Sequence, residues 1–206
     1  MRNIRVAVWG FGAMGGGITK VLLQKTGVEI TGVCDLHPNR VGKSIFALLD
    51  LPRGDRADVI VSDDIDAVLP EKSADVCIVA TDSFTKEVYP KLVKVLSRGV
   101  NAISTAEEMS YPAAKEPELT RELDKIAKAH GVTVLGTGIN PGLMMDLLAI
   151  CLTGCMTQVD KVTCRRVNSL SPFGPLVMQE QGVGLTPEAF QEGVDKGELD
   201  GHVGFA

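Results

Sequence analysis

The sequence lacks an excess of positive charge, and this absence excludes one class of partner. Its 206 residues include 21 lysines and arginines against 26 aspartates and glutamates, so the formal net charge is −5. A protein whose main partner is nucleic acid needs a basic surface patch. We therefore expect no nucleic-acid partner.

Long apolar runs are also absent. The most apolar long segment, residues 142–156, has only 15 residues and includes Asp146. A membrane-spanning helix needs about 20 apolar residues, so this segment is expected to form a buried helix. The chain also shows no basic stretch followed by an apolar helix near its start, which is the pattern of an export signal. We expect no membrane partner and a cytoplasmic location.

Cysteines are few and odd in number, which argues against a disulfide framework. The five are Cys34, Cys77, Cys151, Cys155 and Cys164. Their apolar surroundings favour reduced thiols in the core of a cytoplasmic protein. Cys151 and Cys155 are spaced to share one helical face, but no histidine lies nearby to complete a metal site. We expect no bound metal.

What the chain does contain is an alternation of apolar strand-like runs and amphipathic helical runs. The expected strands are Ile4–Trp9, Glu29–Cys34, Val59–Ser62, Val76–Thr81, Asn101–Ser104 and Thr133–Gly136. Helices are expected between them, among them Ile18–Lys25 and Glu116–His130, the latter ending before Gly131. This alternation predicts an α/β fold with a doubly wound parallel sheet of the Rossmann type.

The pattern changes after Met156. Residues 158–167 alternate between apolar and polar side chains, as in a half-solvated strand of an antiparallel sheet, and a short helix is expected at Pro187–Lys196. We therefore assign residues 1–156 to a dinucleotide-binding domain and residues 157–206 to the start of an α+β domain for substrate binding and dimerisation. About 50 residues are few for an independent core. We expect the chain to be a fragment of a longer protein; the alternative is that this unit borrows its core from a partner.

The most informative motif lies between the first two expected strands. It reads Gly10-Phe11-Gly12-Ala13-Met14-Gly15, and Asp35 follows 20 residues after its last glycine. In a dinucleotide site the glycines allow a tight turn, close approach of a pyrophosphate, and close helix packing. The phosphates then meet the helix N-terminus, while the acid accepts the ribose hydroxyls. The alternative is a glycine-rich turn without a ligand.

Two further segments are expected near the cofactor. Asp35 favours NAD because its charge repels a 2′-phosphate, but Arg40 in the same loop could pair with that phosphate. We expect NAD to be preferred and NADP to be possible, unless Arg40 is only a solvated residue. Thr81, Asp82 and Ser83 follow the central strand and are expected either to approach the nicotinamide ribose or to cap the next helix.

Paired acids follow the fifth expected strand, at Glu107 and Glu108. A carboxylate beside the nicotinamide could take the proton of a substrate ammonium group and later orient water for imine hydrolysis. The alternative is that both acids are surface charges at a helix start. The sequence leaves open which of the two acts.

Substrate-binding candidates come later in the chain. Asn140, in a second glycine-rich turn, offers both a donor and an acceptor, although it could simply be a turn residue before proline. Of Arg165 and Arg166, which point to opposite faces of the expected strand, one could bind a carboxylate bidentately, and Asn168 shares the face of Arg166. His202 lies between glycines and could equally be structural.

Several segments together resemble the 2,4-diaminopentanoate dehydrogenase family. They are residues 8–15, 34–40, 105–109, 136–142 and 166–174. The resemblance runs along essentially the whole chain. That family is related to native amine dehydrogenases and is more distantly similar to dihydrodipicolinate reductase. Its members continue well beyond a position like Ala206.

The resemblance implies an NAD(P)-dependent oxidative deamination of 2,4-diaminopentanoate at C4, giving 2-amino-4-oxopentanoate and ammonia in ornithine degradation. It also implies a small-molecule amino-acid substrate and a homodimer. The first acid of the pair, Glu107, would face the substrate as the catalytic residue. Asn140, Arg166, Asn168 and His202 fall in the matching pocket motifs, which implies substrate binding.

Three other functions remain open from the sequence. A reductase of a cyclic imine, like dihydrodipicolinate reductase, would use the same cofactor site, as would an alcohol oxidation like that of homoserine dehydrogenase. From another class, the chain could be a dinucleotide-binding sensor without turnover.

Overall fold

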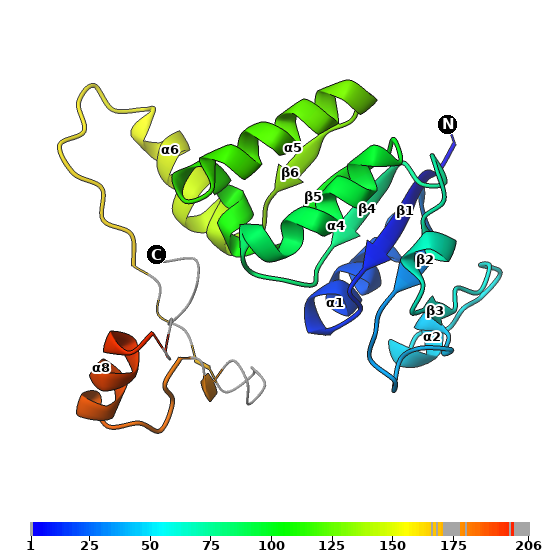
Figure 1. The fold of residues 1–206 in the computed structure, drawn as a ribbon, viewed down its shortest axis with the longest axis horizontal. Coiled ribbons are helices and arrows are strands. Elements are labelled where there is room, and N and C mark those ends of the chain that lie inside the picture. The colour runs from blue at the N-terminus through cyan, green and yellow to red at the C-terminus, as the bar shows by residue number, and fades with distance from the viewer. Residues whose placement is uncertain are drawn as a thin grey trace. The chain divides into compact units, whose positions relative to one another are not determined.

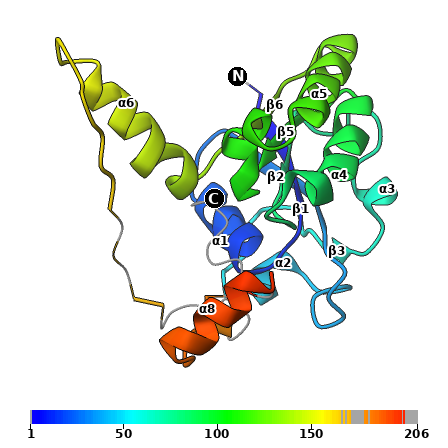
Figure 2. The same ribbon diagram turned by 60° about the vertical axis from the view of Figure 1, so that its left-hand side comes forward.

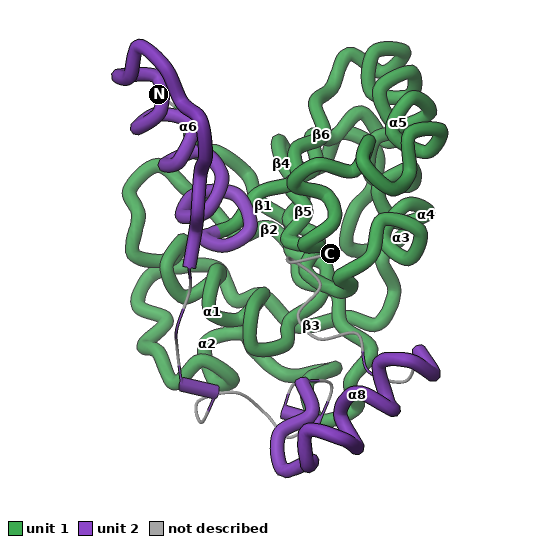
Figure 3. The backbone as a smooth tube through the Cα atoms, turned by 90° about the vertical axis from the view of Figure 1, so that its left-hand side faces the viewer, with its two compact units in different colours: residues 1–138 green, residues 139–206 purple. Residues whose placement is uncertain are grey.

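The structure is a computed structural model that describes residues 2–165, 167, 169–170, 178–179, 181–197 and 199. The chain divides into two compact units, residues 1–138 and residues 139–206 (Figure 3). The division into a dinucleotide-binding domain and a substrate domain at residue 156 stays a prediction.

The first unit is built on a six-stranded parallel sheet in the order β3-β2-β1-β4-β5-β6 (Figure 1). The strands are β1 (Ile4–Trp9), β2 (Val28–Cys34), β3 (Val61–Ser62), β4 (Val76–Val79), β5 (Asn101–Ser104) and β6 (Val134–Gly136). This is the doubly wound order of the Rossmann type, which confirms the predicted fold class. The strand order reverses between β1 and β4, so a ligand crevice is expected where these two strands end.

Helices cover both faces of this sheet. They are α1 (Ala13–Leu22), α2 (Ile45–Leu48), α3 (Ile65–Val68), α4 (Thr85–Ser97) and α5 (Pro117–His130), with two short 3₁₀ turns, η1 (Glu107–Ser110) and η2 (Pro112–Ala114). One face carries α3, α4 and α5, and the other carries α1 and α2 (Figure 2).

Two apolar clusters fill the space between the sheet and its helices. Because both faces are covered, neighbouring residues of one strand are buried on opposite sides. Ala7 of β1 packs in the cluster beneath α4 and α5, whereas Val6 and Val8 pack in the cluster beneath α1 and α2. The strands were therefore readable as continuous apolar runs.

Helix boundaries agree with the sequence at α5 and differ at α1. Gly131 ends α5 in the left-handed region, with φ of +64°, as its position predicted. The expected helix Ile18–Lys25 is wrong in its bounds, because α1 begins at Ala13 and ends at Leu22. Three successive glycines, residues 15–17, lower the helix propensity of the first turns and hide the start from sequence analysis. Close packing of this segment on β1 overrides that propensity.

The regular structure in the described part of the second unit is helical. It contains η3 (Ile139–Leu147), α6 (Leu148–Thr153) and α8 (Pro187–Asp195). Within η3, residues 140–142 have non-helical backbone angles. The expected strand over 158–167 is not formed in described residues 158–165 and 167. A strand needs a neighbour for its ladder hydrogen bonds, and the described residues of this unit provide none. The helix predicted at Pro187–Lys196 is confirmed to within one residue.

The segment 142–156 is largely helical as predicted, through η3 and α6, but its predicted burial is wrong among the described residues. Leu147, Ile150 and Leu152 on this segment are all more than half exposed. Apolar side chains are buried only where another apolar surface covers them, and the described residues of this unit supply none here. Among the described residues, no helix has the length and apolar character that crossing a bilayer requires.

The cysteines are buried in the first unit and exposed in the second. Cys34 and Cys77 are buried in the sheet, but Cys151, Cys155 and Cys164 are exposed, so the prediction of five core thiols holds for two. Burial raises the pKa of the Cys34 thiol to about 11 and that of Cys77 to about 12.

Candidate functional site

The loops at the carboxyl edge of the sheet are joined by main-chain hydrogen bonds. The N–H of Ala80 after β4 donates to Trp9 at the end of β1 over 2.8 Å, and Thr105 donates to Val79 over 3.1 Å. Thr137 after β6 in turn donates to Ser104 over 3.1 Å. The loops that follow β1, β4, β5 and β6 therefore form one continuous rim in which the sequence-predicted residues of this unit can meet.

The glycine turn after β1 leaves no room for side chains at two of its three glycines. Gly10 has a φ of +94°, and a Cβ there would lie 2.5 Å from the carbonyl oxygen of Ala80. A Cβ on Gly15 would lie 1.8 Å from the oxygen of Gly10. At Gly12, by contrast, nothing lies within 4 Å of the Cβ position. The turn is thus compact inside and open outward at Gly12, which fits the approach of a phosphate group.

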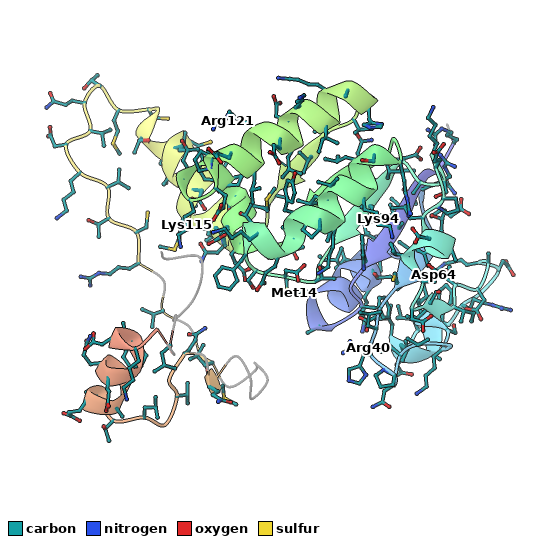
Figure 4. The ribbon with its side chains drawn as sticks, in the orientation of Figure 1. Met14, Arg40, Asp64, Lys94, Lys115 and Arg121 are labelled. Atoms are coloured by element: carbon teal, nitrogen blue, oxygen red, sulfur yellow. The ribbon has the colours of Figure 1, made fainter. Side chains whose placement is uncertain are left out.

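The N-terminus of α1 opens onto the same place. Gly12 is the N-cap, with extended backbone angles and no side-chain cap, and no acidic residue lies in the first turn. The first N–H groups of a helix have no partner within the helix, and its dipole is positive at that end. Phe11 and Ala13 flank the cap, and Met14 is exposed beside it (Figure 4). These groups can hold a pyrophosphate.

Both carboxylate oxygens of Asp35, which follows β2, accept hydrogen bonds from groups of the same chain. Its carboxylate accepts hydrogen bonds from the main-chain N–H of Phe11 at 2.6 Å and from that of His37 at 2.7 Å. Nη1 of Arg40 lies 3.2 Å from both carboxylate oxygens. Burial raises the pKa of Asp35, but the two N–H donors and Arg40 outweigh it and hold the pKa below its ordinary value.

Arg40 is the more accessible member of this pair. Its side chain is 32% exposed, against 9% for Asp35. The guanidinium therefore neutralises the acid from its solvent side. A guanidinium in this position also carries the charge that a phosphate needs.

The segment after β4 does not cap α4 with either Asp82 or Ser83. Asp82 instead pairs with Lys91 of α4, whose Nζ is 2.7 Å from its Oδ1, and it accepts a bond from the hydroxyl of Thr81. Ser83 uses its carbonyl to accept a bond from the loop after β5. The capping alternative for Asp82 and Ser83 is therefore wrong, and the three residues remain at the rim beside the glycine turn.

The two acids of η1 differ in their surroundings. The Oε2 of Glu108 accepts a hydrogen bond of 2.9 Å from the main-chain N–H of Thr85, and its Oε1 lies 3.5 Å from Nζ of Lys115. The carboxylate of Glu107 makes no hydrogen bond or ion pair with any residue that the structure describes. Glu107 is partly exposed. It is therefore the acid left free to meet a substrate.

The remaining candidates belong to the second unit. The Nδ2 of Asn140 is buried and has no hydrogen-bond partner in the part of the chain that the structure describes. Arg165 is exposed. Arg166, Asn168 and His202 lie outside the described residues.

Sequence analysis missed two contacts at this rim, the bond between Glu108 and Thr85 and the pairing of Lys91 with Asp82. Glu108 acts on a helix that begins 23 residues earlier, and Lys91 holds Asp82 from the second turn of α4. Neither contact has a local sequence signature, since each depends on how the loops meet at the rim.

Comparisons with family profiles divide the chain into two parts. Residues 4–111 match the profile described as the N-terminus of dihydrodipicolinate reductase. Residues 143–206 match the profile of the 2,4-diaminopentanoate dehydrogenase C-terminal domain.

Individual proteins match the chain over most of its length. It is 53% identical over 205 residues to a 2,4-diaminopentanoate dehydrogenase of Acetoanaerobium sticklandii, and this match covers 100% of the chain and 58% of that protein. It is 25% identical over 173 residues to an amine dehydrogenase of Streptomyces virginiae, a match that covers 82% of the chain and 47% of the relative.

A solved structure resembles the chain as well. The amine dehydrogenase of Mycobacterium smegmatis superposes with a TM-score of 0.79 at 33% identity, covering 98% of this chain and 59% of that one. The chain thus spans about half to three-fifths of the length of these relatives.

Proposed function

Because the chain belongs to the family defined by the dihydrodipicolinate reductase N-terminus, and 100% of this chain aligns with 58% of a 2,4-diaminopentanoate dehydrogenase, we propose that its protein deaminates 2,4-diaminopentanoate oxidatively. The reaction would release ammonia from C4 and leave 2-amino-4-oxopentanoate. A bound nicotinamide dinucleotide would supply the hydride acceptor.

The observation that carries this proposal is the pairing of an open glycine turn with a free carboxylate on one rim. Gly12 and the first N–H groups of α1 offer a place for a pyrophosphate, and Asp35 with Arg40 lies beside that turn through the bond to Phe11. Glu107 follows β5 on the same rim without a partner among the described residues. Cofactor and proton acceptor would then meet at one edge of the sheet.

In this reaction the residues of the chain bind the substrate and the cofactor, orient a water molecule and transfer a proton. Glu107 takes a proton from the C4 ammonium, because C4 can give up a hydride only when its nitrogen is unprotonated. Glu107 then orients water for attack on the imine. Thr81, Asp82 and Ser83 border the nicotinamide end.

Substrate binding is assigned to the second unit. Asn140 has a buried Nδ2 without a hydrogen-bond partner among the described residues, so it is available to a substrate oxygen. Arg166 would bind the substrate carboxylate, helped by Asn168 and His202, and this assignment is supported by the sequence pattern and by the family profile over residues 143–206.

We propose NAD as the preferred cofactor, with NADP also accepted. Asp35 disfavours a 2′-phosphate, while Arg40 beside it is accessible enough to turn toward one. We further propose a cytoplasmic homodimer that serves ornithine degradation, as the resemblance to the family implies.

One assay distinguishes the proposed reaction from the alternatives. The protein is incubated with 2,4-diaminopentanoate and NAD, and NADH and ammonia are both measured. Equal amounts of the two products are expected. An alcohol oxidation would give NADH without ammonia, a cyclic-imine reductase would not turn over this amine, and a sensor would bind NADH and form neither product. Any of these three results would overturn the proposal.

A further inference from the structure

Glu108 joins two loops of the rim by two separate hydrogen bonds. Its main-chain N–H donates to the carbonyl of Ser83 over 3.2 Å, and its carboxylate accepts from the N–H of Thr85 over 2.9 Å. Both partners belong to the segment that leads from β4 into α4. One residue of η1 therefore fixes the distance between the loop after β4 and the loop after β5.

The start of α4 needs this carboxylate. The N-cap position is occupied by Phe84, whose side chain cannot accept a hydrogen bond. The N–H groups of a first helical turn lack partners within the helix, and an acid placed there also meets the positive end of the dipole. Glu108 fills that role from 23 residues further along the chain. It acts as an N-cap supplied by a different loop.

The hydrogen bond matters more than the charge of Glu108. Its one ion-pair contact among the described residues, to Lys115, is 3.5 Å long, and the lysine side chain is 45% exposed. At that length, and with the lysine open to solvent, this ion pair contributes little. The Glu108 side chain itself is only 11% exposed. Its buried oxygen is therefore committed to the N–H of Thr85.

The remaining residues of η1 show how this bond bears on Glu107. Successive residues of a 3₁₀ turn point about 120° apart, so a side chain next to one that faces α4 is directed elsewhere. Met109 is 5% exposed in the core, and its carbonyl oxygen would be 1.9 Å from a Cβ on Gly136. The turn is thus held at Glu108 and at Met109, and Glu107 is the acid it presents outward.

We infer that Glu108 is a positioning residue for Glu107, and that it acts as a hydrogen-bond acceptor and not as a charge. This inference rests on the proposed function, because it assumes that Glu107 transfers the substrate proton. A shift of the turn by about 1 Å would be enough to lower turnover about 100-fold.

The test compares Glu108→Gln, Glu108→Ala and Glu107→Gln in the whole protein. Each variant is assayed for kcat and KM with 2,4-diaminopentanoate, for NADH affinity and for Tm. Glutamine keeps an oxygen that accepts the Thr85 N–H, so Glu108→Gln should retain kcat within about threefold. Glu108→Ala should lose about 10- to 100-fold in kcat with NADH affinity nearly unchanged. Glu107→Gln should lose turnover although it too is isosteric.

Matched controls separate positioning from stability. Glu116→Ala removes another acid near α4, one that pairs with Lys86 outside the site, and Lys115→Ala removes the ion pair of Glu108. Both should keep kcat. Thr85→Pro removes the donor at the first helical position, where proline is tolerated, and should lower kcat as Glu108→Ala does. This variant tests the bond even where Glu108→Ala fails to fold.

The outcomes are decisive in either direction. Recovery by glutamine together with loss in Glu108→Ala or Thr85→Pro supports the inference. Equal loss in Glu108→Gln and Glu108→Ala would show that the charge acts, and a lower Tm with unchanged kcat would show a purely structural role; either overturns it. A wild-type protein that forms no NADH and ammonia would overturn the proposed function itself, which distinguishes the two failures.

Discussion

Gly15 packs so closely on Gly10 that a Cβ on the first would lie 1.8 Å from the carbonyl oxygen of the second. Gly15→Ala therefore forces the turn and the start of α1 apart. We expect a loss of about 1–3 kcal/mol in the free energy of unfolding, or more. Thermal or urea denaturation measures it.

The control for this variant is Gly17→Ala, two residues further along α1. Nothing lies within 4 Å of its Cβ position. Alanine is the better helix former, so a gain of about 0.5–1 kcal/mol is expected. Equal stability of both variants would contradict the packing argument.

Gly12→Ala should separate cofactor binding from folding. Its Cβ position is open, so the fold tolerates a methyl group there, and the weaker N-cap costs at most about 1 kcal/mol. The same methyl would stand between the backbone and a pyrophosphate. NADH titration by calorimetry should show an affinity at least about tenfold weaker, with Tm little changed. An unchanged affinity would remove the phosphates from this turn.

Glu107→Gln should lower kcat by about 100- to 10,000-fold, because the amide cannot take the ammonium proton. NADH affinity should stay the same, since no hydrogen bond or ion pair among the described residues joins the Glu107 carboxylate to the glycine turn. Steady-state kinetics and NADH titration measure the two effects. Glu118→Gln, on the exposed surface of α5, is the control. Full turnover in Glu107→Gln would take this residue out of the mechanism.

Arg40→Ala should act on cofactor choice. Loss of a charge-assisted bond to a 2′-phosphate should raise KM for NADP by about 10- to 100-fold. KM for NAD should change by no more than about threefold, because Asp35 keeps its bonds to Phe11 and His37. The ratio of the two KM values is the measurement. A parallel rise in both would mean that Arg40 only orders the loop.

Alkylation should divide the five thiols into two groups. At pH 8 Cys34 and Cys77 stay protonated, because burial raises their pKa to about 11 and about 12, and only the thiolate reacts. Cys151, Cys155 and Cys164 are exposed and should react first. Mass spectrometry after a short pulse of iodoacetamide counts the modified sites. Protection of Cys151 and Cys155 would show that another surface covers this segment in the protein.

The raised pKa values of Cys34 and Cys77 predict that the folded chain loses stability at alkaline pH. In the unfolded chain both thiols ionise near their ordinary pKa, whereas in the folded chain they remain protonated to a higher pH. The folded form is therefore favoured fully below the ordinary pKa, and this contribution is lost as the pH rises above it. Replacing both residues with alanine should flatten the fall in stability between pH 8 and pH 11.

The strands were predictable because burial on both faces leaves a continuous apolar run. Each of the six lies within two residues of its expected bounds, and β4 runs through Val76–Val79, with its middle residues fully enclosed. The start of α1 was less predictable, because residues 15–17 are glycines whose helical state depends on packing. Residues 158–165 form no strand, although their side chains alternate between apolar and polar. Such alternation shows which face of a strand could be buried, but a strand also needs a neighbouring strand to pair with.

The residues of the site could be predicted from the sequence, but the hydrogen bonds that join its loops could not. Glycine spacing and the position of Asp35 follow from the motif alone. The different surroundings of Glu107 and Glu108 do not, because they arise where η1 meets the start of α4, 23 residues away. Only the folded chain brings an acid to an uncapped helix.

The carboxylate of Asp35 connects the ends of β1 and β2 through the N–H of Phe11. The turn that would receive the phosphates and the acid that would receive the sugar are thus already tied together before any ligand arrives. A nucleotide would meet a rigid cradle, and little conformational entropy would remain to be lost on association. Weakening the bond between Asp35 and Phe11 should therefore lower the affinity for the pyrophosphate and for the ribose together.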